Sequence, residues 1–91
     1  MRRNKNWAVK LLSFIEAHDL EGIGLTRFEL RKMFANDKES SGMDTFEIFN
    51  VVDYHLSLLE SANFVMLKKD EEDKEADDFM LTWSGHDQIE R

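Results

Sequence analysis

The sequence predicts an α+β fold of the winged helix-turn-helix class, with a three-helix core, a C-terminal β-hairpin wing and a short final helix. Two helical patterns begin with capping boxes, at residues 26–29 and 44–47. After Asn63 the apolar period changes, and two runs of strand length follow at residues 64–69 and 78–83. Three helices, two strands and a last helix, in this order, are typical of a winged helix-turn-helix domain.

The first helix is predicted over about residues 4–18. Apolar and aromatic side chains recur there at helical spacing, which gives the helix a core-facing side. The residues that set this spacing are Trp7, Leu11, Phe14, Ile15 and His18. Gly22 lies beyond the end of the helix, and residues 22–25 form a short extended link.

The second helix is predicted to begin after Thr26. The threonine hydroxyl is a natural N-cap, and Glu29 three residues later completes the capping box. Leu25 and Leu30 stand at the two positions that pack together as a hydrophobic staple. The helix is expected to continue to about Ala35, where the polar stretch NDKESSG breaks it.

The third helix, residues 44–62, repeats this signal, because its first residue is a capping aspartate and Glu47 completes the box. Its apolar residues cover more than one stripe, which predicts a central helix packed on two sides. Phe49 and Leu59 are therefore expected in the core. Asp53 is expected to point into solvent, so that reversing its charge would barely affect folding.

The charged stretch between the two strands, about residues 70–77, is expected to be a flexible wing tip. The last helix follows within the sequence LTWSGHD, with Ser84 as its N-cap and Asp87 in the box position. Trp83 is expected to fill the core, and Gly85 is expected to permit close packing.

Length and composition limit the function. The 91 residues are expected to form a single domain, residues 1–91, with one core. The chain contains no cysteine, which excludes disulfides and thiolate metal sites and fits a cytoplasmic location. No run of about 18 apolar residues occurs, so we expect no membrane span.

Two passages, YHLSLLESANFV (residues 54–65) and FMLTWSGHDQIER (residues 79–91), resemble an uncharacterised family of small phage and bacterial winged-helix proteins. The second passage carries the family's C-terminal signature of leucine, threonine, tryptophan, any residue, glycine and histidine. The resemblance covers nearly the full length, although only these passages are specific. It implies a winged-helix fold and a phage or mobile-element setting, and it implies no reaction. Many relatives have glycine where Asn63 stands, which implies a left-handed helix end at this residue.

Candidate catalytic chemistry is sparse. Ser84, His86 and Asp87 are the residue types of a hydrolytic or metal-binding cluster, but neighbours on one turn do not arrange a base against a nucleophile. His18, His55 and His86 fall on three different helices, without the close-spaced pair of a zinc site. His55 is expected to be half-buried with one hydrogen bond. We therefore predict no enzyme, no metal site and no cofactor.

Charge is unevenly distributed along the chain, whose net charge is −7. Residues 1–38 hold eight basic and five acidic residues, whereas residues 39–91 hold four basic and fourteen acidic ones. The third helix and the wing, which usually supply phosphate contacts in a DNA-binding winged helix, are acidic and would repel phosphate. The predicted partner-binding acidic face consists of Glu47, Asp53, Glu60, Asp70, Glu71, Glu72 and Asp73.

This acidic face predicts a protein–protein interaction or regulatory module, whose partner is a basic protein or a second copy of the chain in a homodimer. Nucleic acid is disfavoured as a partner, but two alternatives stay open. In the first alternative, the chain is a DNA-binding transcriptional regulator that uses the second helix and the N-terminal arm. In the second, its acidic face imitates DNA and inhibits a nucleic-acid-binding protein. The face for the first alternative consists of Arg2, Arg3, Arg27, Arg31 and Lys32.

Overall fold

The computed structural model of the chain describes residues 1–89. The α-helices in this part of the chain are α1 (Lys5–His18), α2 (Arg27–Ala35), α3 (Thr45–Ser61) and α4 (Trp83–Ile89). The strands are β1 (Leu25–Thr26), β2 (Val65–Lys68) and β3 (Asp78–Leu81), and two 3₁₀ turns are η1 (Lys38–Ser40) and η2 (Lys74–Ala76). These elements and their order confirm the predicted winged helix-turn-helix fold.

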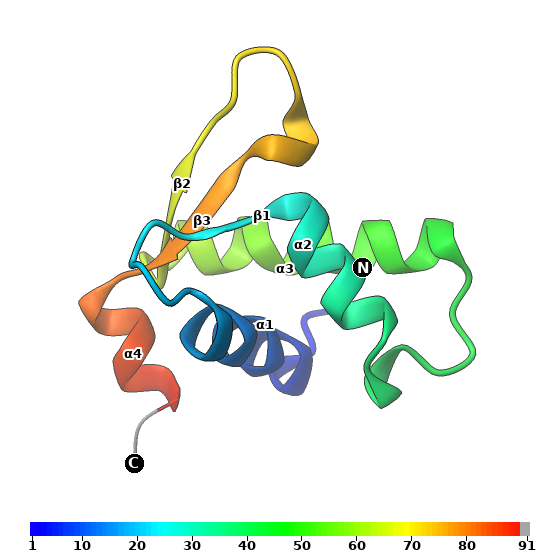
Figure 1. Cartoon of the computed structure of the whole chain (residues 1–91). Helices are drawn as coiled ribbons and strands as arrows, with labels where there is room; N and C mark the ends of the chain where they lie inside the picture. The colour runs from blue at the N-terminus through cyan, green and yellow to red at the C-terminus, as the bar shows by residue number, and fades with distance from the viewer. Residues whose placement is uncertain (90–91) are drawn as a thin grey trace.

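The sheet is antiparallel, with strand order β1-β3-β2. In its register Phe79 of β3 lies opposite both Leu25 of β1 and Leu67 of β2. Alternate side chains of a strand point to opposite faces, so Phe79 and Val65 enter the core while Met66 remains exposed. The β2–β3 hairpin, including η2, extends away from the helices as the wing (Figure 1).

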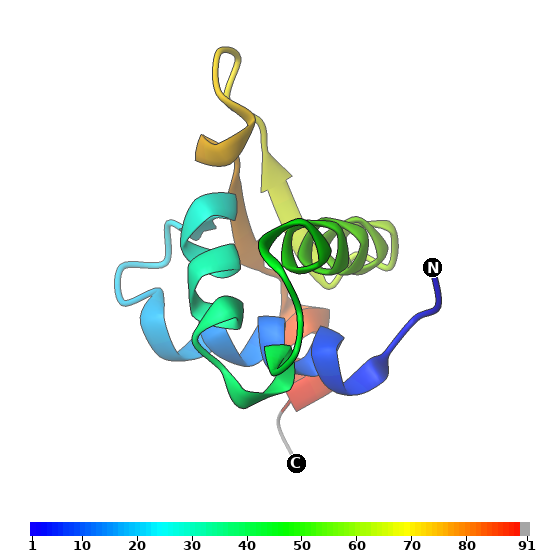
Figure 2. The ribbon, with the colours of Figure 1, turned by 90° about the vertical axis from the view of Figure 1, so that its right-hand side faces the viewer.

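The helices enclose one core beneath the sheet. Figure 1 shows α1 running below α2 and α3, with α4 at one end of α1. Figure 2 looks along α3 and shows α2 on one side of it and the wing above both. The apolar core residues with at most 2% of their surface exposed are Leu11, Leu12, Ile15, Leu30, Phe34, Val52, Leu56, Val65 and Phe79. Because α2, α3 and the base of the wing share this core, they form one unit.

The helix starts follow from local hydrogen bonds. The Thr26 hydroxyl accepts from the Glu29 N–H at 3.1 Å, and the Glu29 carboxylate accepts from the Thr26 N–H at 2.9 Å. At α3, a carboxylate oxygen of Asp44 accepts from the Glu47 N–H at 2.8 Å. Both predicted capping boxes are therefore confirmed. Asn63 has a φ of 63°, which confirms the left-handed helix end.

The start of α4 differs from the prediction. Its first residue is Trp83, and the Thr82 hydroxyl accepts from the Gly85 N–H at 3.0 Å, so Thr82 rather than Ser84 caps the helix. Because the helix begins at Trp83, the indole turns away from the core and is 86% exposed. The expectation of a buried Trp83 is wrong.

Gly85 confirms the predicted close packing. It is buried, and a Cβ atom placed on it would lie only 2.0 Å from the Phe64 carbonyl oxygen. The same carbonyl accepts a hydrogen bond from the Thr82 N–H at 3.1 Å. The backbone of α4 is thus held directly against the start of β2. Within residues 1–89, no helix is both long and apolar enough to cross a bilayer.

Candidate nucleic-acid interface

The surface that a winged helix uses for recognition is formed by α3, the preceding α2 and the wing. In this chain an ionic network built on two buried arginines ties the three together. Arg27 and Arg31 lie one turn apart on α2 and are only 6% and 8% exposed. Both guanidinium groups point toward α3 and the wing rather than into solvent. Here the network means Arg27, Arg31, Asp53, Glu75 and Asp77.

Arg27 joins α2 to the wing. Its Nη2 lies 2.9 Å from Oδ2 of Asp77, and its Nε donates to the Lys74 carbonyl at 3.2 Å. Its Nη1 reaches Oδ1 of Asp53 on α3 at 3.2 Å. The guanidinium also lies over the Phe79 ring, 5.0 Å from its centroid. Each nitrogen of this buried guanidinium therefore has an oxygen partner, and the group also contacts an aromatic ring.

Arg31 completes the network in a two-pronged contact. Its Nε and Nη2 donate to the two oxygens of Asp53 at 3.1 and 2.6 Å, which is the bidentate geometry that suits arginine and carboxylate. Its Nη1 donates to Glu75 of the wing. The Cζ atom of this guanidinium lies over the Phe49 ring, 4.2 Å from its centroid.

Asp77 is the most enclosed carboxylate of the network. Burial disfavours its charge, but hydrogen bonds from the Asp70 N–H at 2.8 Å and from Arg27 outweigh burial, so its pKa lies below the ordinary aspartate value. The side chain thus stays ionised while buried. It connects the turn at the wing tip to α2.

The network corrects two expectations from the sequence. Asp53 was expected to point into solvent without a counter-charge, but it is paired with two arginines. Arg27 and Arg31 were expected on an alternative nucleic-acid face, but both are buried. The sequence separations within the network run from 22 to 50 residues, so no local pattern could reveal it. The spacing of four between the arginines was the single available signal.

The other residues of the predicted nucleic-acid face do not come together. Lys32 is exposed on α2, and Arg2 and Arg3 are exposed at the N-terminus. Figure 2 shows the N-terminus on one side of α3 and α2 on the other. The second helix and the N-terminal arm therefore do not share one surface.

The remaining acidic residues have mixed roles. Glu47 belongs to the α3 capping box, and Glu60 is exposed farther along the same helix. At the wing tip, Asp70 accepts from the N–H groups of Glu72 and Asp73 at 3.0 and 2.9 Å. The carboxylates of Asp70 and Asp73 thus shape the turn. The acidic face is therefore interrupted by residues that serve the fold.

The outward side of α3 near its start carries aromatic and amide groups. Phe46 is 74% exposed and Phe49 is 38% exposed, although the apolar pattern predicted Phe49 in the core. Asn50 is exposed, and within residues 1–89 its side-chain amide makes no hydrogen bond. Leu59, on the inward side, is only 4% exposed, which confirms its predicted burial. Sequence reasoning did not single out Asn50, because one polar residue in an apolar run carries no distinctive signal.

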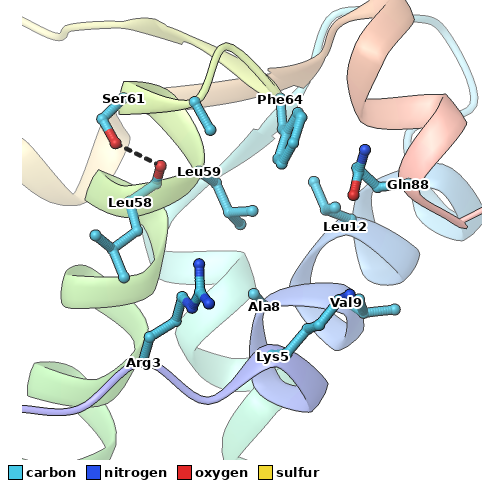
Figure 3. Close-up of a pocket in the computed structure, with 11 residues that line it drawn as sticks. Arg3, Lys5, Ala8, Val9, Leu12, Leu58, Leu59, Ser61, Phe64 and Gln88 are labelled. Carbon is cyan, nitrogen blue, oxygen red and sulfur yellow. Dashed lines mark hydrogen bonds between the residues drawn. The ribbon is translucent and has the colours of Figure 1, made fainter.

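A hollow lies between α1 and the end of α3, with a volume of about 380 Å³ (Figure 3). Leu12, Leu58 and Phe64 supply much of its apolar wall, and Arg3 and Lys5 add two cations. It lies at the opposite end of α3 from Phe46. Among the described residues, none that lines this hollow is a member of the network.

His55 is a structural residue in the core. It is fully buried, and its Nε2 accepts from the Asn4 N–H at 2.9 Å while its Nδ1 lies 2.8 Å from the Val51 carbonyl. The expectation of a half-buried histidine with one hydrogen bond is therefore wrong. Both ring nitrogens are occupied, and among residues 1–89 no three metal-ligating side chains gather.

No protein-family model matches the chain, and no curated protein sequence matches it either. Among solved structures, the fold is similar to that of a mutant of S. aureus MepR bound to an oligodeoxyribonucleotide, with a TM-score of 0.66 and 21% sequence identity. The similarity covers 92% of this chain and 51% of the MepR chain, so this chain spans about half the length of that protein.

This comparison corrects the functional prediction. The acidic composition predicted a protein–protein interaction module, but the similar structure is that of a DNA-bound chain. At 21% identity this likeness shows the fold. The network also weakens the argument from acidity, because the carboxylate at the middle of α3 is paired with two arginines inside the molecule.

Proposed function

We propose that this chain is a non-enzymatic DNA-binding transcriptional regulator that places the N-terminal half of α3 in the major groove of duplex DNA. The observation that carries the proposal is that α2, α3 and the wing are locked by the network into one surface. The fold is similar to that of a chain bound to an oligodeoxyribonucleotide, which supports the same choice. An α-helix fits the width of the major groove.

The charge of the chain does not oppose this docking as strongly as the composition suggests. Asp53 and Asp77 face Arg27 and Arg31 at hydrogen-bonding distance, so their charges are balanced locally. Near the start of α3, Asp44 and Glu47 are the two exposed acids, and both belong to the capping box. Exposed charges farther than about 10 Å from the duplex are largely screened at ordinary salt.

Phosphate contacts would come from exposed lysines around α3. Lys32 lies near the end of α2, Lys68 and Lys69 lie at the end of β2, and Lys74 begins η2 in the wing. This is a small number of cations. We therefore expect weak binding to random duplex, with a Kd of about 1–100 µM at physiological salt.

The test is the salt dependence of binding, measured by fluorescence anisotropy with a labelled random duplex between about 50 and 200 mM NaCl. Four lysine–phosphate contacts give a slope of log K against log salt of about −3.6. Replacing Lys68 and Lys69 together by glutamine should make the slope shallower by about 2. The proposal fails if the wild-type chain binds no duplex at low salt.

A matched control separates specific contacts from net charge. Ser84→Asp with Gln88→Glu changes the net charge by the same two units, but both positions lie exposed on α4. This pair should leave the slope unchanged. An equal change in both double variants would mean that only the overall charge matters and that the wing makes no contact.

A further inference from the structure

We propose that the outward side of α3 recognises A·T base pairs, with the Asn50 amide bonding an adenine edge and the Phe46 and Phe49 rings contacting thymine methyl groups. This inference rests on the proposed function, which it deepens by naming the sequence class and the residues that read it. The three side chains are called the reading face below.

The reading face is one continuous stripe of the helix. Residues three and four apart on an α-helix are surface neighbours, so Phe46 lies beside both Phe49 and Asn50. Along the helix, the exposed fraction of the side chain falls from 74% at Phe46 to 38% at Phe49. One turn farther along the same stripe is Asp53, which is bound by Arg31. The stripe therefore ends at the network.

The Phe49 ring is held in place by Arg31. The Arg31 guanidinium lies 4.2 Å from its ring centroid and is itself fixed by two hydrogen bonds to Asp53. A rigid aromatic ring presents a fixed apolar surface at little entropic cost. Such a surface favours contact with a thymine methyl group. The cytosine edge offers an amino donor and no methyl, so it gains less from this contact.

Asn50 supplies the polar half of the recognition. Its amide has a donor and an acceptor side by side, and adenine presents an acceptor at N7 beside a donor at N6 in the major groove. Guanine presents two acceptors and no donor at this edge, so the amide oxygen of Asn50 would find no partner there. The Asn50 side chain is exposed and makes no hydrogen bond within residues 1–89, so it remains available.

Glu47 lies on the same turn of α3 and would favour a different base. A carboxylate only accepts hydrogen bonds, and it would favour the amino group of cytosine. It lies about 100° around the helix from Phe46, and its carboxylate oxygen faces the Asp44 N–H at 3.5 Å in the capping box. Its position at the cap places it beside the stripe rather than within it.

The experiment selects preferred duplexes from a random library with the wild-type chain, and then measures affinities by anisotropy. We expect enrichment of A·T pairs, and a loss of about 5–150-fold in affinity when the contacted pair is changed to G·C. Asn50→Ala should weaken this discrimination and leave the part that comes from thymine methyl contacts, while the affinity for random duplex and its salt slope stay within about twofold. Phe46→Ala should reduce the preference for thymine over cytosine.

The control variant is Asn6→Ala, which removes an exposed asparagine of α1 that lies off the reading face. It should retain full discrimination, and circular dichroism should show all variants folded. If no duplex binds, the proposed function itself fails. If duplex binds without A·T enrichment, with an enrichment that neither Asn50→Ala nor Phe46→Ala reduces, or with a cytosine preference that Glu47→Gln removes, this inference fails while the proposed function stands.

Discussion

At the scale of single residues, Asp53 has the largest structural role of any charged side chain on α3. Its two oxygens accept three hydrogen bonds from two arginines that are both less than 10% exposed. Buried guanidinium groups depend on such partners, because a buried charge without a counter-charge costs several kcal/mol. The carboxylate is thus a structural requirement, although the sequence presents it as an ordinary surface acid.

Replacing Asp53 by lysine should therefore be strongly destabilising. The change leaves Arg27 and Arg31 buried next to a third cation, and we expect a loss of about 3–5 kcal/mol in the free energy of unfolding. Urea denaturation measures this loss. Glu60→Lys on the exposed end of α3 is the control and should change stability by less than about 0.5 kcal/mol. Equal effects of the two variants would contradict the structure of the network.

Acid should weaken the fold through two aspartates. The pKa of Asp77 lies below the ordinary value of 3.8, because hydrogen bonds from Asp70 and Arg27 outweigh its burial. The pKa of Asp37 is also lowered, chiefly by the Glu39 N–H and further by Lys10. A lowered pKa in the folded state means that stability is fully present above the unfolded value and is lost as the pH falls through the folded one.

We therefore expect the free energy of unfolding to be steady near neutral pH and to fall below about pH 4. Asp77→Asn should be less stable at neutral pH and should show a shallower decline in acid, because one of the two titrating groups is gone. Urea titrations between pH 2 and pH 7 measure both effects. An unchanged acid slope in this variant would show that Asp77 does not titrate with folding.

The caps show which residue-level features a sequence can predict. The boxes at Thr26 and Asp44 join residues three apart, so both partners are visible in a short window. The network joins residues 22 to 50 apart, and its members carry no motif. Local hydrogen bonds were therefore predicted, and the long-range ion pairs were not.

At the scale of elements, α3 has two kinds of apolar residue that its sequence does not distinguish. Leu59 is buried in the core, whereas Phe49 covers a guanidinium at the surface. An apolar pattern reports that a side chain avoids water on average. It does not report whether the side chain is covered by the core or by the stem and charge of an arginine.

Truncation to alanine should separate these two roles. Leu59→Ala opens a cavity in the core and should cost about 2–5 kcal/mol in the free energy of unfolding. Phe49→Ala loses a partly exposed ring and a contact with Arg31, and we expect a smaller loss of about 1–2 kcal/mol. Thermal or urea unfolding of both variants is the measurement. A greater loss from Phe49→Ala would show that this ring is more deeply covered than in the structure.

The end of the chain marks the limit of element-level prediction. A last helix was predicted, and α4 is present, but it begins at Trp83 with Thr82 as its cap. Threonine and serine are both good caps, so propensity alone could not choose between them. The choice follows from the contact of Gly85 with the Phe64 carbonyl, which is a tertiary feature.

At the scale of the whole molecule, the fold class follows from the sequence because it depends on the order and period of local patterns. The function does not follow in the same way. A net charge of −7 describes the average over the chain, whereas recognition depends on the few groups that face the partner. The network pairs some of the acidic residues with arginines inside the molecule, so these acids do not face a partner. The average charge therefore misled the prediction of a partner.

The network also has a dynamic consequence. Because Arg27 and Arg31 bridge α2, α3 and the wing, the hairpin is not free to swing as a separate arm. Amide protons at the base of the wing should exchange with solvent at the same free energy of opening as those of α3, as members of one cooperative unit. Asp53→Asn should uncouple them, so that the hairpin exchanges first and the two rates diverge. The distance between α3 and the hairpin would then fluctuate instead of being fixed.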